Sequence, residues 1–78
     1  MRDVEISHQP IELYKILKFE GLVASGGEAK AVIDAGQVMV NGVVETRRRN
    51  KIVSGDIIDF GDEKIRIQLV SKPEGDPV

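Results

Sequence analysis

The stretch at residues 25–44, SGGEAKAVIDAGQVMVNGVV, contains the change of pattern that decides the fold. In its first half, Ser25 followed by Glu28 has the spacing of a capping box, in which each side chain satisfies a free backbone N–H group at a helix start. Gly36 is a typical residue for the end of such a helix. Between them runs a narrow apolar stripe of Ala29, Val32 and Ile33. The first half therefore predicts a short amphipathic helix.

The second half of the stretch changes to the period of a β-sheet. QVMV and VVE are short β-branched runs around Asn41-Gly42, the strongest short-range signal for a two-residue hairpin turn. Further along, VSGD predicts a turn, IIDF a strand and GDE another turn. In KIRIQLV, residues 64–70, apolar and polar side chains alternate, which predicts a half-buried strand.

Upstream of this stretch, PIELYKILKFEG predicts a first helix. Pro10 fits a first helical turn, where its missing N–H costs nothing, and Gly21 is a suitable stop. The apolar residues with helical spacing are Leu13, Ile16, Leu17 and Leu22. The predicted order is helix, helix, hairpin, loop, strand and strand. This order predicts an α+β fold, with two N-terminal helices packed on one face of a small, mostly antiparallel β-sheet.

The length of 78 residues suits one domain, which we place at residues 1–70. A domain of this size buries only about 60% of its unfolded surface, so its core must be economical. Aromatic residues make up 4% of the chain, so we expect a core of Val, Ile, Leu and Ala. Residues 71–78 contain two prolines and one glycine, and we expect them to form a flexible C-terminal tail.

The composition argues against several classes of function. There is no Cys, which excludes a disulfide scaffold, a thiolate metal site and a Cys nucleophile. No apolar run approaches the roughly 20 residues that span a bilayer, and residues 1–10 lack an apolar signal-peptide core. His8, the only histidine, is expected to be a solvated side chain in a loop. We therefore expect a cytoplasmic protein that is not an enzyme and takes no metal, cofactor, membrane or small-molecule substrate.

Basic residues gather in one part of a mildly acidic chain. The chain has 11 basic and 13 acidic residues, a formal net charge of −2. Residues 29–51 contain five basic and two acidic residues, a net charge of +3, so the remainder carries −5. Arg47, Arg48 and Arg49 are consecutive, directly after the predicted hairpin. Such segregation favours a polyanionic partner that docks on one face, because the acidic remainder repels it elsewhere.

The arginines have two interpretations. A guanidinium group is a planar fork of donors that matches phosphate oxygens, so three adjacent arginines on a loop can contact several phosphates. Alternatively, they form exposed ion pairs, which contribute little to stability and explain three in a row poorly. The candidate partners in that case are Glu45, Asp56, Asp59 and Asp62.

The predicted helices have two other features that concern binding. Gly26 and Gly27 lie in the first turn of the second helix, where bare backbone N–H groups are accessible to an anion. A loose helix start that is merely tolerated explains them as well. Lys15 and Lys18 lie on the solvent side of the first helix and are ordinary for a solvated face.

The ordered motifs resemble the S-four-type RNA-binding domain, a family named for a small-subunit ribosomal protein. The similarity covers residues 13–58, and the chain most resembles the small stand-alone bacterial members, of the YbcJ type. The matching residues are Leu13, Leu17, Gly21-Leu22, Ser25, Ala29-Lys30, Ile33, Gly36, Val38, Val40-Asn41-Gly42 and Gly55-Asp56-Ile58. The resemblance implies the alpha-L RNA-binding motif and the binding of structured RNA, such as ribosomal or transfer RNA.

The resemblance also implies a site, because the family's RNA surface combines the second helix with the hairpin and the loop after it. The residues that it implicates are Lys15, Ser25, Gly26, Gly27, Lys30, Arg47, Arg48, Arg49 and Lys51. Gly26 and Glu12 stand where the family often has arginine, so more of the basic surface falls to the loop. Few aromatic residues are available for base stacking, which favours recognition by phosphate and shape contacts.

A different class of function is also open. The NG hairpin and the late GD turn are similar to those of ubiquitin-like sulfur carriers, so a non-catalytic protein-interaction domain is the alternative. The carrier chemistry itself needs a C-terminal Gly-Gly, whereas this chain ends in EGDPV. We expect a monomer in either case, because two helices and one sheet face account for the apolar residues.

Overall fold

The computed structural model describes residues 1–70, and the predicted C-terminal tail at residues 71–78 lies outside the described residues. The described part of the chain contains seven strands and two helices. In chain order, these are β1 (Arg2–Ile6), β2 (Ile11–Glu12), α1 (Leu13–Phe19), α2 (Gly26–Asp34), β3 (Val38–Val40), β4 (Val43–Val44), β5 (Lys51–Ile52), β6 (Ile57–Phe60) and β7 (Glu63–Leu69).

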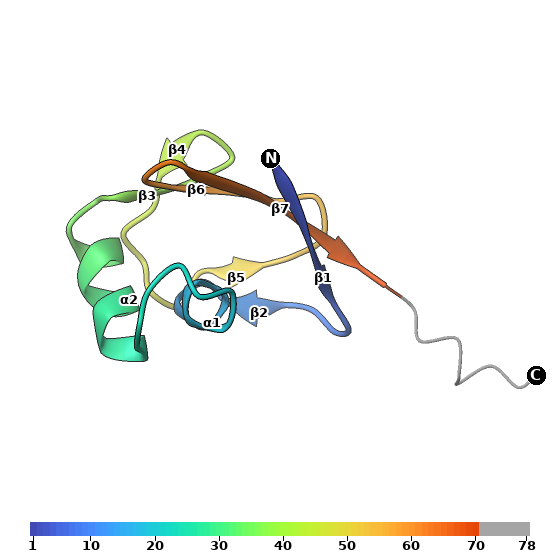
Figure 1. Ribbon diagram of the computed structural model, residues 1–78, viewed down its shortest axis with the longest axis horizontal. Coiled ribbons are helices and arrows are strands. Elements are labelled where there is room, and N and C mark those ends of the chain that lie inside the picture. Colours follow the sequence, from blue (N-terminus) through green and yellow to red (C-terminus); the bar gives the residue numbers. More distant parts are fainter. Residues whose placement is uncertain (71–78) are drawn as a thin grey trace, which may run out of the picture.

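Five of the strands form one sheet in the order β1-β7-β6-β3-β4, and β2 pairs with β5 in a separate two-stranded ladder. All neighbours in the large sheet are antiparallel except β1, which runs parallel to β7. Figure 1 shows this sheet as one layer, with α1 and the β2–β5 ladder beneath it and α2 at one side. The prediction of an α+β fold with a mostly antiparallel sheet is confirmed.

The core lies between these layers and consists of aliphatic side chains. In β7, Ile65 and Ile67 point inward while Lys64 and Arg66 are exposed, which is the predicted alternation. The part of the chain that the structure describes has no buried polar or charged residue. The largest fully buried side chains are Leu13, Leu17, Ile33, Val38, Ile52, Ile58, Ile65 and Ile67. Each contributes about 1.5–3 kcal/mol of stability by leaving water.

The prediction that the helices come first is wrong, because the strands β1 and β2 precede them. β1 forms the edge of the large sheet and pairs with β7, with Val4 opposite Ile67. Val4 and Ile6 are buried, and the charged side chains between and beside them face solvent. This strand has only two apolar residues, so its stability depends on the partner strand from the other end of the chain.

The first helix also begins later than the sequence predicts. Ile11 and Glu12 pair with Ile52 and Lys51 in the β2–β5 ladder, so α1 starts only at Leu13. The extended backbone of the ladder cannot be helical at the same time. The segment predicted as a loop after the hairpin therefore contains β5.

The Asn41-Gly42 turn has the predicted geometry. Asn41 has φ 54° and Gly42 has φ 84°, and Val40 pairs with Val43 across the turn. The Asn41 side chain donates to the Asp56 carboxylate at 3.0 Å and accepts the Ile57 N–H at 2.9 Å. The two most recognisable motifs of the second half, VNG and GD, are therefore bonded to each other.

Replacing Gly42 with Val is expected to destabilise the fold by about 1–2 kcal/mol, because a β-branched residue tolerates positive φ poorly. An added Cβ at Gly42 meets nothing within 4 Å, so the cost comes from the backbone alone. Gly26→Val is the matched control, since its Cβ also has open space and its φ is not positive. Thermal melts should show the larger loss for Gly42→Val. Equal losses would contradict the turn geometry.

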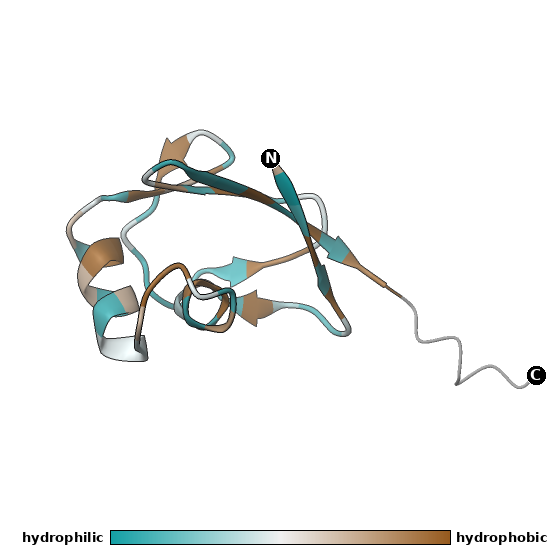
Figure 2. Ribbon diagram, viewed as in Figure 1, coloured by the Kyte–Doolittle hydropathy of each residue, from teal (hydrophilic) through white to brown (hydrophobic). Residues whose placement is uncertain are grey.

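The β3–β4 hairpin leaves apolar side chains exposed. Val43 and Val44 are 68% and 54% exposed, and Met39 on the neighbouring strand is 37% exposed. Figure 2 shows β4 as a hydrophobic strand at the rim of the sheet. The expectation that the helices and one sheet face account for all apolar residues is therefore wrong at this hairpin. The monomeric state stays a prediction.

Candidate nucleic-acid interface

The arginine loop, residues 45–50, is held against the start of α1 by its backbone. The Leu13 N–H donates to the Asn50 carbonyl at 2.9 Å, and the Tyr14 N–H donates to the Arg48 carbonyl at 3.2 Å. The residue before the helix, Glu12, makes no side-chain cap. Because the first N–H groups of a helix lack partners within it, the loop carbonyls replace a conventional cap. The arginines are thereby fixed beside α1. Figure 2 shows the loop as a hydrophilic segment that descends from β4 toward α1.

Arg48 forms a bidentate ion pair with Asp34, the last residue of α2. The Nε–Oδ1 distance is 3.2 Å and the Nη2–Oδ2 distance is 2.7 Å. The hydrogen bond from the guanidinium group lowers the pKa of Asp34, and the same contact raises the pKa of Arg48. The negative end of the helix dipole favours a cation at this position. The pair connects the loop to the second helix.

Arg47 pairs with Glu45 in the same loop. The Glu45 carboxylate accepts the Arg47 backbone N–H at 2.9 Å, its Nε–H at 2.9 Å and its Nη2–H at 3.1 Å. The side-chain hydrogen bond from Arg47 is the main cause of the lowered pKa of Glu45. The ion-pair interpretation is therefore correct for two of the three arginines, with Glu45 as an expected partner and Asp34 as one that it did not include.

The lowered pKa values fix the pH range of both pairs. Asp34 and Glu45 have folded-state pKa values below their ordinary values, so their ion pairs stabilise the fold above the ordinary pKa of about 4. This contribution is lost as the pH falls through the lowered values. At neutral pH, both guanidinium groups are engaged by carboxylates.

Tyr14 lies where cations from two helices meet. The Lys30 Nζ of α2 is 5.0 Å from the centre of the Tyr14 ring, and the Lys15 Nζ is 6.0 Å from it. Both distances are in the range of a cation–π contact. The sequence patterns did not distinguish Tyr14 as a site residue. Tyr14 lies on α1 between buried Leu13 and exposed Lys15, and the packing of α2 against α1 brings Lys30 to its ring.

The remaining cations are available to a ligand. Lys30, Arg49 and Lys51 form no ion pair with any residue in 1–70, whereas Lys15 contacts the Glu12 carboxylate at 3.5 Å. We define the basic surface as the six predicted cations of α1, α2, the arginine loop and β5. They are Lys15, Lys30, Arg47, Arg48, Arg49 and Lys51.

The predicted anion site at the start of α2 lies at the opposite end of that helix from Asp34 and its partner Arg48. Ser25 caps the helix, and its Oγ accepts the Glu28 N–H at 3.1 Å. The Glu28 carboxylate accepts the Ala24 N–H at 2.8 Å rather than that of the cap residue itself. Gly26 lies eight residues from Asp34, about 12 Å along the axis at 1.5 Å per residue. A phosphate at Ser25, Gly26 and Gly27 stays a prediction and would have to tolerate the nearby carboxylate.

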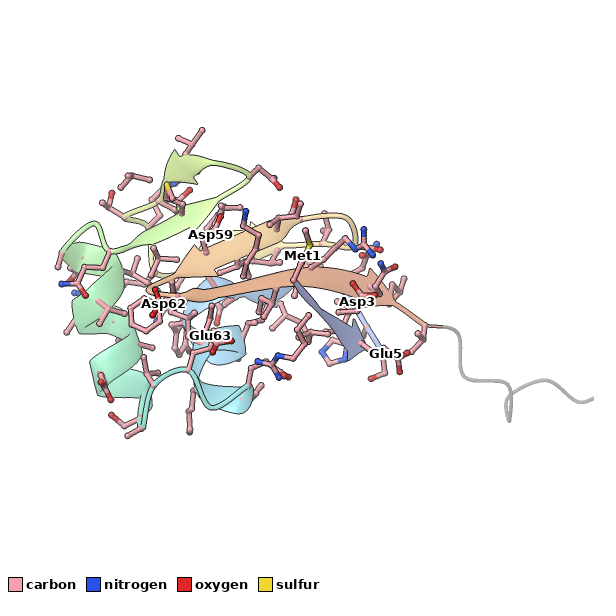
Figure 3. The ribbon with its side chains drawn as sticks, turned by 45° about the horizontal axis from the view of Figure 1, so that its top comes forward. Met1, Asp3, Glu5, Asp59, Asp62 and Glu63 are labelled. Atoms are coloured by element: carbon pink, nitrogen blue, oxygen red, sulfur yellow. The ribbon has the colours of Figure 1, made fainter. Side chains whose placement is uncertain are left out.

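The outer face of the large sheet carries acidic side chains. Asp3 and Glu5 on β1 and Asp59 on β6 project from it, as Figure 3 shows. Two cations of β7 are paired there, Arg66 with Asp3 at 3.0 Å and Lys64 with Asp59 at 3.9 Å. Two of these three carboxylates are therefore paired with cations of β7.

The described residues lack two features that would indicate other functions. In the range 1–70, no group of three or more His, Asp or Glu side chains lies close enough to hold a metal ion. No helix of that range is long and apolar enough to cross a membrane.

A family model, two sequence relatives and a solved structure each match most of this chain. A family model described as "S4 domain" matches residues 4–68. The Escherichia coli (strain K12) protein named "Putative RNA-binding protein YbcJ" is 45% identical over 60 residues, which cover 77% of this chain and 86% of that protein. The Shigella flexneri "Uncharacterized protein YbcJ" matches with the same identity and coverage.

The solution structure of YbcJ from E. coli is also similar. The TM-score is 0.68 at 40% sequence identity, and the match covers 87% of both chains. That structure is described as revealing an αL motif involved in RNA binding.

Proposed function

Since the chain belongs to the S4 domain family, as its motifs predicted, we propose that it binds structured RNA through the basic surface. The proposed ligand is a folded ribosomal or transfer RNA, recognised by phosphate and shape contacts. The names of the E. coli relative and of its solution structure support RNA as the class of ligand.

The observation that carries the proposal is the meeting of cations from separate elements around Tyr14. Lys15 of α1 and Lys30 of α2 lie over the Tyr14 ring, and the Arg48 backbone carbonyl accepts the Tyr14 N–H, while the Arg48 side chain pairs with Asp34 at the end of α2. Elements distant in the sequence thus place their charges on one face. A duplex or folded RNA presents its phosphates at fixed spacing, so a rigid array of cations can bind it by shape.

The aromatic side chains favour structured RNA over single strands. Phe60 packs against the core, Tyr14 is half-buried beside the two lysines, and Phe19 is the one aromatic residue in the range 1–70 that is largely exposed. Too few rings are exposed to stack successive bases, which is how sequence-tolerant single-strand binders gain affinity.

Paired and unpaired cations are expected to contribute differently. Arg47 and Arg48 already have carboxylate partners, so a phosphate must replace a carboxylate or share the guanidinium group with it. Arg49 and Lys51 meet a phosphate without that exchange. The unpaired cations should therefore provide most of the net attraction.

A salt titration of RNA binding tests the proposal. Transfer RNA and a ribosomal RNA hairpin should bind with a log K that falls steeply with log salt, by about 0.9 per phosphate contact. An unstructured single strand of equal length should bind more weakly. Absence of binding to both folded RNAs at low salt would refute the proposed function.

Releasing the paired arginines is expected to strengthen binding. Asp34→Asn and Glu45→Gln each remove one negative charge and free a guanidinium group, so each should raise RNA affinity about threefold to tenfold at low salt. Asp3→Asn is the matched control, because it makes the same charge change and frees Arg66 on the outer sheet face. Native gel shifts measure all three variants. An equal gain in the control would show that net charge alone is responsible.

A further inference from the structure

An open pocket of about 370 Å³ lies beside α1, at the edge of the basic surface. Its apolar wall is formed by Pro10, Ile11 and Phe19, and its polar rim includes Glu12, Lys15 and Lys51. Pockets of this size, with an apolar wall and a few polar groups, are typical of sites that bind a small molecule or a single chemical group of a larger ligand. Phosphate contacts alone do not explain why an apolar wall adjoins the cations.

The exposed ring of Phe19 is the main feature of this wall. Phe19 is the last residue of α1 and is 66% exposed, although neighbouring α1 side chains fill the core. A single exposed apolar residue is ordinary on a protein surface. This ring, however, lines a pocket together with a proline and two lysines, and aromatic faces beside cations are suited to a nucleobase and its phosphate.

The polar rim adds a second requirement. Glu12 and Lys51 are partners across the β2–β5 ladder, and the Lys15 Nζ is 3.5 Å from the Glu12 carboxylate. Two cations and one carboxylate therefore line the same rim. The cations suit the phosphates on either side of a nucleotide. The carboxylate can only accept hydrogen bonds, which suits the exocyclic amino group of a base.

The pocket is continuous with the basic surface. Lys15 contributes to both, and it lies over the same Tyr14 ring as Lys30. Lys51 follows the arginine loop directly, one residue after Asn50. An RNA that docks on the loop therefore brings its neighbouring nucleotides to the pocket mouth.

We propose that this pocket receives one unpaired, amino-bearing nucleobase of the bound RNA, stacked on Phe19 with its phosphates at Lys15 and Lys51. The inference rests on the proposed function and refines it. The preferred ligand is a helix interrupted by a bulged adenosine, cytidine or guanosine, rather than a continuous duplex. Removing a base from its stack costs least when it is already unpaired.

The test compares a fully paired RNA duplex, the same duplex with one bulged adenosine, and a version with a bulged uridine. The wild-type protein should prefer the adenosine bulge over the paired duplex by about tenfold, which corresponds to about 1.4 kcal/mol and is in the range expected for stacking one base on an aromatic ring. The uridine bulge should show a smaller preference. Equal binding of adenosine and uridine bulges would overturn the assignment of an amino group to Glu12.

Phe19→Ala should abolish the preference for the bulge and leave the affinity for the paired duplex unchanged, whereas Phe19→Tyr should retain both. Val43→Ala is the matched control, because Val43 is 68% exposed and lies on the hairpin outside the pocket. A fluorescent adenine analogue at the bulge should be quenched by the wild type and not by Phe19→Ala.

The outcomes separate this inference from the proposed function. If the wild type binds duplex and bulge equally, or Phe19→Ala keeps the preference, the nucleobase pocket is refuted while RNA binding stands. The pocket would then suit another occupant, such as an acidic peptide. If the wild type binds none of the RNAs, both proposals fail.

Discussion

Replacing Lys30, Arg49 and Lys51 together by alanine is expected to lower the affinity for structured RNA by about two orders of magnitude. Each contact between two surface charges is worth roughly 1 kcal/mol, or about fivefold in affinity. These three cations have no carboxylate partner in residues 1–70, so no internal pair compensates for their loss. The slope of log K against log salt should flatten by about 0.7–0.9 for each contact removed.

The matched control removes three cations from elsewhere on the molecule. Arg2, Lys64 and Arg66 make ion pairs with Glu20, Asp59 and Asp3, away from the arginine loop. Their replacement by alanine makes the same change in net charge but should leave the salt slope nearly intact. The loss in the test variant should be similar across RNA sequences, because phosphate contacts do not read bases. An equal loss in both triple variants would show that the basic surface is not the binding site.

Replacing Arg47, Arg48 and Arg49 together is a less specific test, because two effects on RNA affinity combine. Two of these residues neutralise Asp34 and Glu45, so their removal also exposes two carboxylates to the RNA. The affinity loss would then combine lost attraction with new repulsion. The slope should still flatten, and the protein should remain folded, because the loop caps α1 through backbone carbonyls that alanine keeps.

Val4→Asn is expected to destabilise the protein by about 2–4 kcal/mol. Val4 is 5% exposed in β1, so the substitution loses an apolar contact and places an amide in a core that offers no polar partner. For a domain of this size, that loss lowers the melting temperature by roughly 10–30 °C. Since the whole free energy of unfolding of a small domain is only about 5–15 kcal/mol, this loss is a substantial fraction of it.

Glu5→Asn introduces the same residue at the next position, on the opposite face of the strand. Glu5 is exposed, so this substitution should change the stability by no more than about 0.5 kcal/mol. Thermal or chemical melts of the two variants measure the difference. Similar losses, or a larger loss for Glu5→Asn, would mean that β1 does not pair with β7 in the register that sets Val4 opposite Ile67.

Several elements were predictable because their signals are local. The capping box at Ser25 and Glu28, the Asn41-Gly42 turn and the alternation in β7 each depend on residues within a few positions of one another. The backbone conformation that they require is fixed by short-range hydrogen bonds and sterics, which the sequence displays directly. The same local motifs, in their order, were sufficient to identify the family.

Other elements have no local signal strong enough to be read. β1 has two apolar residues among charged ones, and β2 and β5 are two residues long. Each is a strand only because a partner from elsewhere in the chain satisfies its backbone groups. For β1, that partner is β7, with Asp3 opposite Arg66. The later start of α1 follows from the same cause.

The candidate site divides in the same way. The sequence by itself determined that the cations are concentrated in residues 29–51, and it indicated the Glu45–Arg47 pair, which spans two residues. Only the tertiary structure decided which charges remain available to RNA. Arg48 is neutralised by Asp34, 14 residues away on α2, and Lys30 lies over a tyrosine of α1. Charge composition is a sum over residues, whereas the field that a ligand meets depends on distances that only packing sets.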